Sequence, residues 1–79
     1  DIFKPEGNQW FWNVYKRLIN QGVGGMWGDL GEPEVFPSKV TTAAGKADEV
    51  HNIYGHHWAK LIAEGYKKDF PNQRPFILM

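Results

Sequence analysis

Apolar side chains recur every three or four residues early in the chain, which is the spacing that gives an α-helix one apolar face. This spacing predicts a helix from about Asn8 to Gln21, with the apolar positions Trp10, Phe11, Val14, Leu18 and Ile19. Pro5 and Asn8 favour a helix start, and Gly22 suits the left-handed position that follows a helix end.

The same helical spacing returns in the second half of the chain. It predicts a helix from Asp48, whose side chain and charge suit an N-cap, to about Lys68, before Pro71. Its apolar positions are Val50, Ile53, Tyr54, Trp58, Leu61, Ile62 and Tyr66.

Two shorter stretches have the pattern of β-strands. Val23 to Leu30 is rich in glycine around Met26 and Trp27, which predicts a short buried strand that other backbone or a ligand can approach closely. The closing residues 74–79, RPFILM, hold four consecutive apolar side chains, as expected of a parallel strand buried on both faces. Between helix and strand patterns lies Gly31 to Ala47, a loop of about 17 residues where about six is usual, so it is predicted to be functional or disordered.

The order of these elements, which is helix, strand, long loop, helix, strand, predicts the α/β class. A strand connected through a helix to a parallel strand is the repeating unit of that class. The length of 79 residues allows one small unit, and a chain this short buries so little surface that we expect it to be part of a larger protein.

Charge and composition exclude several classes of function. Nine basic and nine acidic residues give a formal net charge of zero, so we expect no nucleic-acid partner and no anionic membrane. No apolar run is long enough to span a bilayer, and the first residues do not resemble a signal peptide. Cysteine is absent, which excludes disulfides and thiolate zinc sites but leaves the compartment open.

Asp29 is the principal candidate for chemistry. Alternation along the predicted strand places Trp27 and Asp29 on one face, and α/β enzymes keep catalytic groups at the carboxyl ends of parallel strands. An equally weighted alternative is an aspartate that caps the loop by bonding backbone amides. Glu32 and Glu34 follow closely, and two carboxylates in one turn are more often solvated charges than a catalytic pair.

The aromatic and histidine residues have simpler interpretations. Trp27 could stack on a sugar, but core packing is favoured for it, and packing roles are expected for Trp10, Trp12 and Trp58. His51, His56 and His57 lack the four-residue spacing of helical zinc ligands, so solvent-facing or capping roles are favoured and no metal or cofactor is expected.

Other catalytic motifs fail on spacing. The third glycine that a dinucleotide loop requires after Gly22 and Gly24 falls on Trp27, and the chain has no P-loop. Ser38 is the only serine and lacks the context of a nucleophile elbow.

Two long segments resemble a known family. The segments QGVGGMWGDLGEPEVFPS and ADEVHNIYGHHWAKLIAEGYKKDFPNQRPFILM are similar to the middle of the catalytic barrel of glycoside hydrolase family 31, the α-glucosidases and α-xylosidases. The signature is Trp27, a spacer, Asp29, an apolar residue, a small residue and then Glu32–Pro33. The sequence departs from the family at Gly24, where an aspartate is expected, and at Phe36, where histidine is frequent.

The resemblance implies a helix–strand–helix–strand fragment of a (β/α)8 TIM barrel, residues 1–79 being a single segment with about the fourth and fifth strands. Asp29 would be the nucleophile of a retaining exo-acting α-glycosidase, whose acid/base aspartate lies downstream of Met79. Glu32 would support the nucleophile loop and Trp27 would lie near the sugar. The expected partners are an α-linked oligosaccharide or glycoside and the remainder of the barrel, and the chain alone is expected to be inactive.

Three other functions remain open from sequence. A transglycosylase of the same family would pass the sugar to another sugar instead of water. A non-catalytic carbohydrate or protein interaction module is compatible with the 15% aromatic content. A structural piece could also dimerise through the edges of its two strands.

Overall fold

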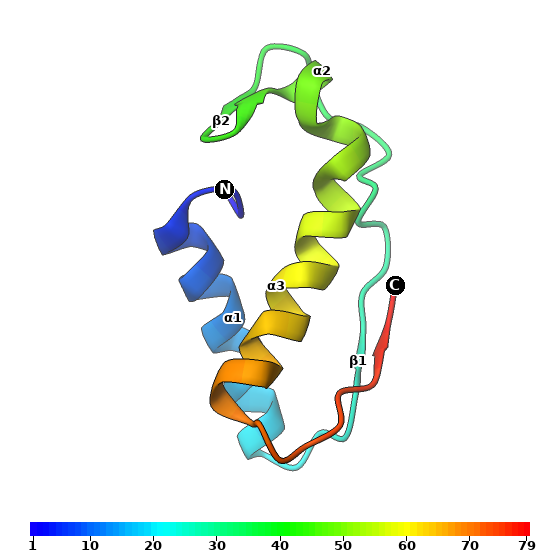
Figure 1. Cartoon of the computed structure of the whole chain (residues 1–79). Helices are drawn as coiled ribbons and strands as arrows, with labels where there is room; N and C mark the ends of the chain where they lie inside the picture. The colour runs from blue at the N-terminus through cyan, green and yellow to red at the C-terminus, as the bar shows by residue number, and fades with distance from the viewer.

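The computed structural model describes all of residues 1–79 and consists of two long helices beside a two-stranded parallel ribbon (Figure 1). In chain order the elements are α1 (Pro5–Asn20), β1 (Met26–Trp27), β2 (Thr41–Thr42), β3 (Gly45–Lys46), α2 (Ala47–Val50), the 3₁₀ turn η1 (His51–Ile53), α3 (Tyr54–Asp69) and β4 (Ile77–Leu78). Both predicted helices and both predicted strands are therefore present.

Helix α1 begins earlier than its apolar spacing indicates. Pro5 occupies the first turn, where a missing N–H costs nothing, and Gly22 follows the helix with φ of +102°. The backbone N–H of Gly22 donates to the carbonyl of Ile19 at 2.9 Å, which satisfies one of the last free carbonyls of the helix.

The second helical stretch is not one helix, as the spacing predicted, but α2, η1 and α3 in succession. Asp48 is not the N-cap, because α2 already begins at Ala47. The Asp48 carboxylate instead accepts a hydrogen bond from the Ser38 hydroxyl at 2.8 Å, and the Lys46 N–H donates to Glu49 Oε2 at 2.8 Å. These contacts fasten the preceding segment to the first turn of α2.

The predicted loop from Gly31 to Ala47 contains structure that its sequence did not reveal. Thr41 pairs with Lys46 and Thr42 with Gly45 in an antiparallel hairpin, β2–β3. Gly45 has φ of +144°, and the Thr42 hydroxyl donates to its carbonyl at 2.8 Å, which closes the turn. Each strand has two residues, too few for alternation of apolar and polar positions to mark it.

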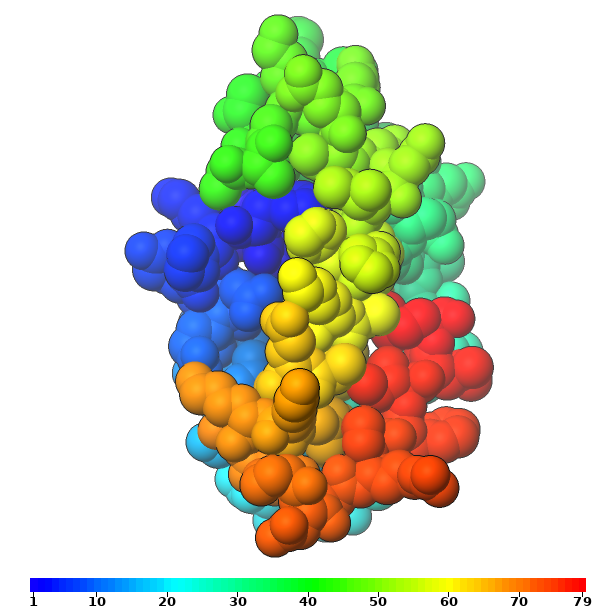
Figure 2. Space-filling view, in the orientation of Figure 1, coloured from blue at the N-terminus to red at the C-terminus, as the bar shows by residue number.

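Strands β1 and β4 run parallel, as predicted, with Met26 opposite Ile77 and Trp27 opposite Leu78. The N–H of Met26 donates to the Phe76 carbonyl and the N–H of Gly28 to the Leu78 carbonyl, both at 2.8 Å. Figure 2 shows the C-terminal segment lying beside α3. Strand β1 is shorter than the predicted Val23 to Leu30, because only Met26 and Trp27 pair with residues of β4.

The core lies between α1, α3 and the inner face of the ribbon. Its buried residues are Ile2, Trp12, Ile19, Met26, Leu61, Ile62 and Tyr66. Trp12 has the predicted packing role: its ring lies against Gly65, where a β-carbon would overlap the indole, and its Nε1 donates to Asp69 Oδ2 at 2.6 Å. None of the helices is both long and apolar enough to cross a membrane.

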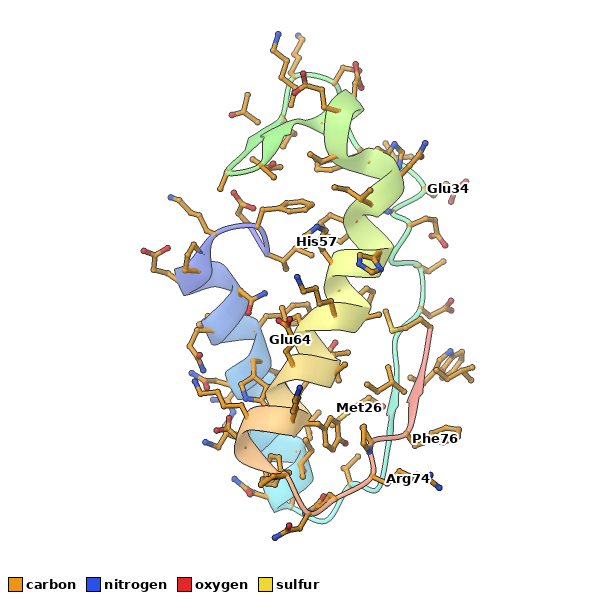
Figure 3. The ribbon with its side chains drawn as sticks, viewed as in Figure 1. Met26, Glu34, His57, Glu64, Arg74 and Phe76 are labelled. Atoms are coloured by element: carbon orange, nitrogen blue, oxygen red, sulfur yellow. The ribbon has the colours of Figure 1, made fainter.

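The outer face of the ribbon is uncovered, and Trp10 on α1 is exposed as well; these two findings correct three expectations. Met26 points toward α3 and is 6% exposed, whereas Phe76 points away from the helices and is 67% exposed (Figure 3). The final strand is thus buried on one face only, because helices pack on one side of the ribbon. Trp27, 74% exposed, and Trp10, 69% exposed, are also not the core residues that their pattern favoured.

Candidate active site

Asp29 lies directly after β1, where the ribbon ends. Gly28 is buried and hydrogen-bonded to β4, while Trp27 on one side and Asp29 on the other are exposed. This alternation is the one expected for an extended chain, and it puts the Trp27 and Asp29 side chains on the face opposite the helices. The exposure of both residues agrees with the predicted sharing of a face.

A cavity of about 180 Å³ lies at this end of the ribbon. It is lined by Gly28, Asp29, Leu30, Gly31, Glu32, Gly55 and Met79. The structure therefore brings Asp29 and Glu32 to one cavity, and both come from the same loop. Trp27 and Glu34 do not line this cavity.

The Asp29 side chain does not cap its own loop. Hydrogen bonds to carboxylate oxygens in this structure go to Asp1, Asp48, Glu49 and Asp69. Asp29, exposed at the edge of the cavity, is not among them. Its carboxylate is thus free to meet a ligand, which is what a nucleophile or a ligand-binding acid requires.

The loop that carries Asp29 has an unusual backbone. Leu30 has φ of +57°, a left-handed conformation that costs a residue with a β-carbon about 1 kcal/mol or more. Gly31 follows, and a β-carbon there would overlap Cε3 and Cζ3 of Trp58. A β-carbon on Gly28 would lie 3.3 Å from Cζ2 of the same ring and 2.6 Å from Sδ of Met79. The backbone on both sides of Asp29 and Leu30 therefore approaches one indole.

Trp58 comes from α3 and is itself held by α1. Its indole Nε1 donates to the Tyr15 hydroxyl at 2.7 Å, and its ring stacks on Phe11 with centroids 5.9 Å apart. Burial raises the pKa of Tyr15, outweighing the opposite effect of this hydrogen bond, so the hydroxyl stays neutral near pH 7. Sequence patterns mark Trp58 as a packing residue, but they contain no signal that joins it to Tyr15 or to the Asp29 loop.

The rest of the long segment is attached to η1. A ring nitrogen of His51 hydrogen-bonds the Pro33 carbonyl, and the ring packs edge-on against Phe36 with centroids 5.7 Å apart. His56 is exposed, and the half-buried His57 ring lies 4.9 Å from that of Phe3. No three side chains of His, Asp or Glu are grouped so as to hold a metal ion.

Two parallel strands joined through a helix, with a free carboxylate at the carboxyl end of the first, are the repeating part of α/β enzymes. Comparison with known proteins identifies the class. The profile of the family 31 glycosyl hydrolase TIM-barrel domain matches residues 1–79. The chain belongs to glycosyl hydrolase family 31 and is part of its TIM barrel.

Individual relatives agree with this assignment. The chain is 30% identical to human neutral alpha-glucosidase C and 27% identical to alpha-glucosidase 2 of Bacillus thermoamyloliquefaciens, over 99% of its own length in each case. It spans only 10% and 11% of these two relatives.

A solved structure has the same fold. A family 31 dextranase of Flavobacterium johnsoniae, as a variant complexed with isomaltotriose, superposes with a TM-score of 0.77 at 30% identity. The match covers 99% of this chain and 11% of the dextranase. The same enzyme complexed with glucose gives the same TM-score at 31% identity.

Proposed function

We propose that the protein carrying this chain is a retaining, exo-acting α-glycosidase of α-glucosidase type, and that β1 and β4 are about the fourth and fifth strands of its barrel. The observation that carries the proposal is the position of Asp29: it follows a parallel strand, is exposed and lines a cavity with its carboxylate unbonded. Relatives that are alpha-glucosidases and a dextranase that holds isomaltotriose support a glycoside as substrate.

In this proposal Asp29 attacks the anomeric carbon of an α-linked sugar. The carbon–oxygen bond to the leaving group breaks as the bond to the Asp29 oxygen forms, and a second carboxyl group about 5 Å away protonates the leaving oxygen. The same group then takes a proton from a water molecule whose oxygen bonds to the anomeric carbon, and the bond from that carbon to the Asp29 oxygen breaks, which releases the sugar and restores the carboxylate. A fixed, ionised carboxylate stabilises the cationic transition state more than the neutral substrate, and this difference accelerates the reaction.

The second carboxyl group is not proposed to be Glu32. Glu32 lies three residues after Asp29 in the same loop and lines the same cavity, so we assign it a role in supporting the nucleophile loop. The acid/base must come from another part of the protein. Trp27, exposed on the face that Asp29 shares, offers an aromatic surface on which the apolar side of a sugar ring can pack.

Replacing the nucleophile tests this function. In the full-length protein we expect Asp29→Ala to lower kcat on p-nitrophenyl α-D-glucopyranoside by at least about 10³-fold, because no other group can form the covalent intermediate. Glu34→Gln is the matched control, since Glu34 is an exposed acid of the same segment outside the cavity. Turnover that survives in Asp29→Ala would refute the role of Asp29, whereas sugar binding without turnover in the wild type and in both variants would instead indicate a non-catalytic carbohydrate module.

Hydrolase and transglycosylase differ only in the acceptor. The proposal expects free sugar as the main product, and a second sugar added as acceptor should change this little. Analysis of the products by chromatography distinguishes the two, because a transglycosylase would yield mainly lengthened oligosaccharides.

A further inference from the structure

We propose that Trp58 is a positioning residue for the Asp29 loop, and that the Tyr15 hydroxyl fixes its indole in the orientation the loop requires. The inference rests on the proposed function, because it concerns how the nucleophile of that reaction is held. It assigns a role to two side chains on different helices, neither of which lines the cavity.

The Trp58 ring contacts the backbone on both sides of Asp29 and Leu30. Gly31 leaves no room for a β-carbon above Cε3 and Cζ3 of Trp58, and Gly28 approaches Cζ2 of the same ring. Asp29 and Leu30 are the two residues between these contacts. A backbone in van der Waals contact with one rigid ring on both sides of a residue follows that ring when it moves.

The loop that carries Asp29 has a strained backbone at Leu30. Leu30 is held with φ of +57°, which a leucine adopts only where its surroundings impose it. Without the ring beneath Gly31, the loop is free to relax to an ordinary backbone conformation. Such relaxation turns the adjoining peptide units and moves the Asp29 carboxylate away from its present direction.

The orientation of the Trp58 indole is fixed by two residues of α1. Its Nε1 donates to the Tyr15 hydroxyl at 2.7 Å, and one face stacks on Phe11 at an interplanar angle of 25°. Stacking fixes the plane of the ring, and the hydrogen bond selects one of the two ways in which the indole can lie in that plane. Since catalytic groups must be held within about 0.5 Å of their working geometry, a supporting hydrogen bond of this kind affects the rate.

The test compares three hydroxyl or indole deletions in the full-length protein. Tyr15→Phe removes the hydroxyl that accepts the hydrogen bond and keeps the aromatic ring of residue 15. Trp58→Phe removes the N–H donor together with part of the ring surface that Gly28 and Gly31 contact. The control is Tyr66→Phe, which deletes a buried hydroxyl that has no hydrogen-bond partner and lies far along α3. Kinetics use p-nitrophenyl α-D-glucopyranoside, and the rate of covalent labelling uses 5-fluoro-α-D-glucopyranosyl fluoride.

We expect Tyr15→Phe to lower both kcat and the labelling rate about 10-fold, with KM changed less than about threefold, because the transition state and not substrate binding is affected. Trp58→Phe should lower them at least as much, and Tyr15→Phe added to Trp58→Phe should have no further effect. Tyr66→Phe should match the wild type.

Four results would overturn the inference. Wild-type rates in Tyr15→Phe would show that the hydrogen bond positions nothing. Effects of the two substitutions that simply multiply would show that Tyr15 does not act through Trp58. A wild-type protein that is not labelled at Asp29 would refute the proposed function and this inference with it, whereas normal labelling of Asp29 at equal rates in all variants refutes the inference alone. Tyr15→Phe keeps the aromatic volume, so the test remains decisive if Trp58→Phe fails to fold.

Discussion

Side-chain contacts around Asp29 explain why glycine is needed where the sequence has it. Gly31 faces the Trp58 ring, while Gly24, seven residues earlier, has open space around the position of a β-carbon. Both glycines lie in the glycine-rich segment 24–31, and nothing in the sequence around them distinguishes their roles. Their different surroundings give a matched pair of substitutions.

We expect Gly31→Ala to destabilise the protein by about 1–3 kcal/mol, because the indole or the loop must shift to admit the methyl group. Gly24→Ala should change stability by no more than about 0.5 kcal/mol. Denaturant unfolding of the full-length variants, followed by tryptophan fluorescence, measures both. Equal stability of the two variants would contradict the close packing of Gly31 on Trp58.

At this scale the sequence was informative where a residue's role depends on chain geometry alone. Alternation in a strand placed Trp27 and Asp29 on one face, and this holds in the structure. The link from Tyr15 to Trp58 could not be predicted, because it joins residues 43 positions apart on two helices. The roles assigned to Asp29, Glu32 and Trp27 remain predictions that the kinetic tests address.

A second tryptophan, Trp12 in the middle of α1, connects this helix to Asp69 at the C-terminal end of α3. The Trp12 indole donates to Asp69, and Lys16 lies 3.5 Å from the same carboxylate oxygen. The Trp12 hydrogen bond, chiefly, and then Lys16 lower the pKa of Asp69, against the opposing effect of desolvation. The ionised form of Asp69 is therefore favoured in the folded protein.

The pH dependence of stability follows from this lowered pKa. Stabilisation by ionised Asp69 is present above the pKa of an unfolded aspartate and is lost as pH falls through the lower folded value. We expect the melting temperature of the full-length Trp12→Phe variant to fall less between about pH 5 and pH 3 than that of the wild type. Parallel curves for the two proteins would show that the hydrogen bond does not shift this carboxylate.

Helices and strands were predicted correctly where the spacing of apolar residues repeats over many positions. Sixteen residues of α1 and of α3 repeat the helical spacing four times, so both were predicted, with only their ends displaced. The β2–β3 hairpin and the break at η1 were missed because each involves two or three residues. Burial of RPFILM on both faces was wrong for this chain, because burial depends on neighbouring strands and not on the strand's own composition.

The whole molecule is elongated, with extents of 40 × 22 × 16 Å, and its ribbon is covered on one side only. Trp27, Phe76 and Leu78, all exposed, form an apolar outer face on β1 and β4. A TIM barrel closes eight strands so that such a face is buried in its interior. With two strands, the chain supplies the loop that carries Asp29 but not the enclosed interior of a barrel.

We accordingly expect the isolated chain to have no glycosidase activity, because the proposed function requires an acid/base and sugar-site walls from other parts of the barrel. The measurement is release of p-nitrophenol from p-nitrophenyl α-D-glucopyranoside by the purified 79-residue chain, beside the full-length protein at equal concentration. Turnover by the isolated chain that disappears in Asp29→Ala would contradict this expectation.

Trapping of the covalent intermediate shows directly whether Asp29 is the nucleophile of a retaining α-glycosidase. The full-length protein is exposed to 5-fluoro-α-D-glucopyranosyl fluoride, which forms the glycosyl-enzyme faster than water removes it, and is then digested for peptide mapping by mass spectrometry. We expect one added fluoroglucosyl group, carried by Asp29. A label on another carboxylate, or turnover of this reagent by a folded protein with Asp29 unmodified, would contradict it.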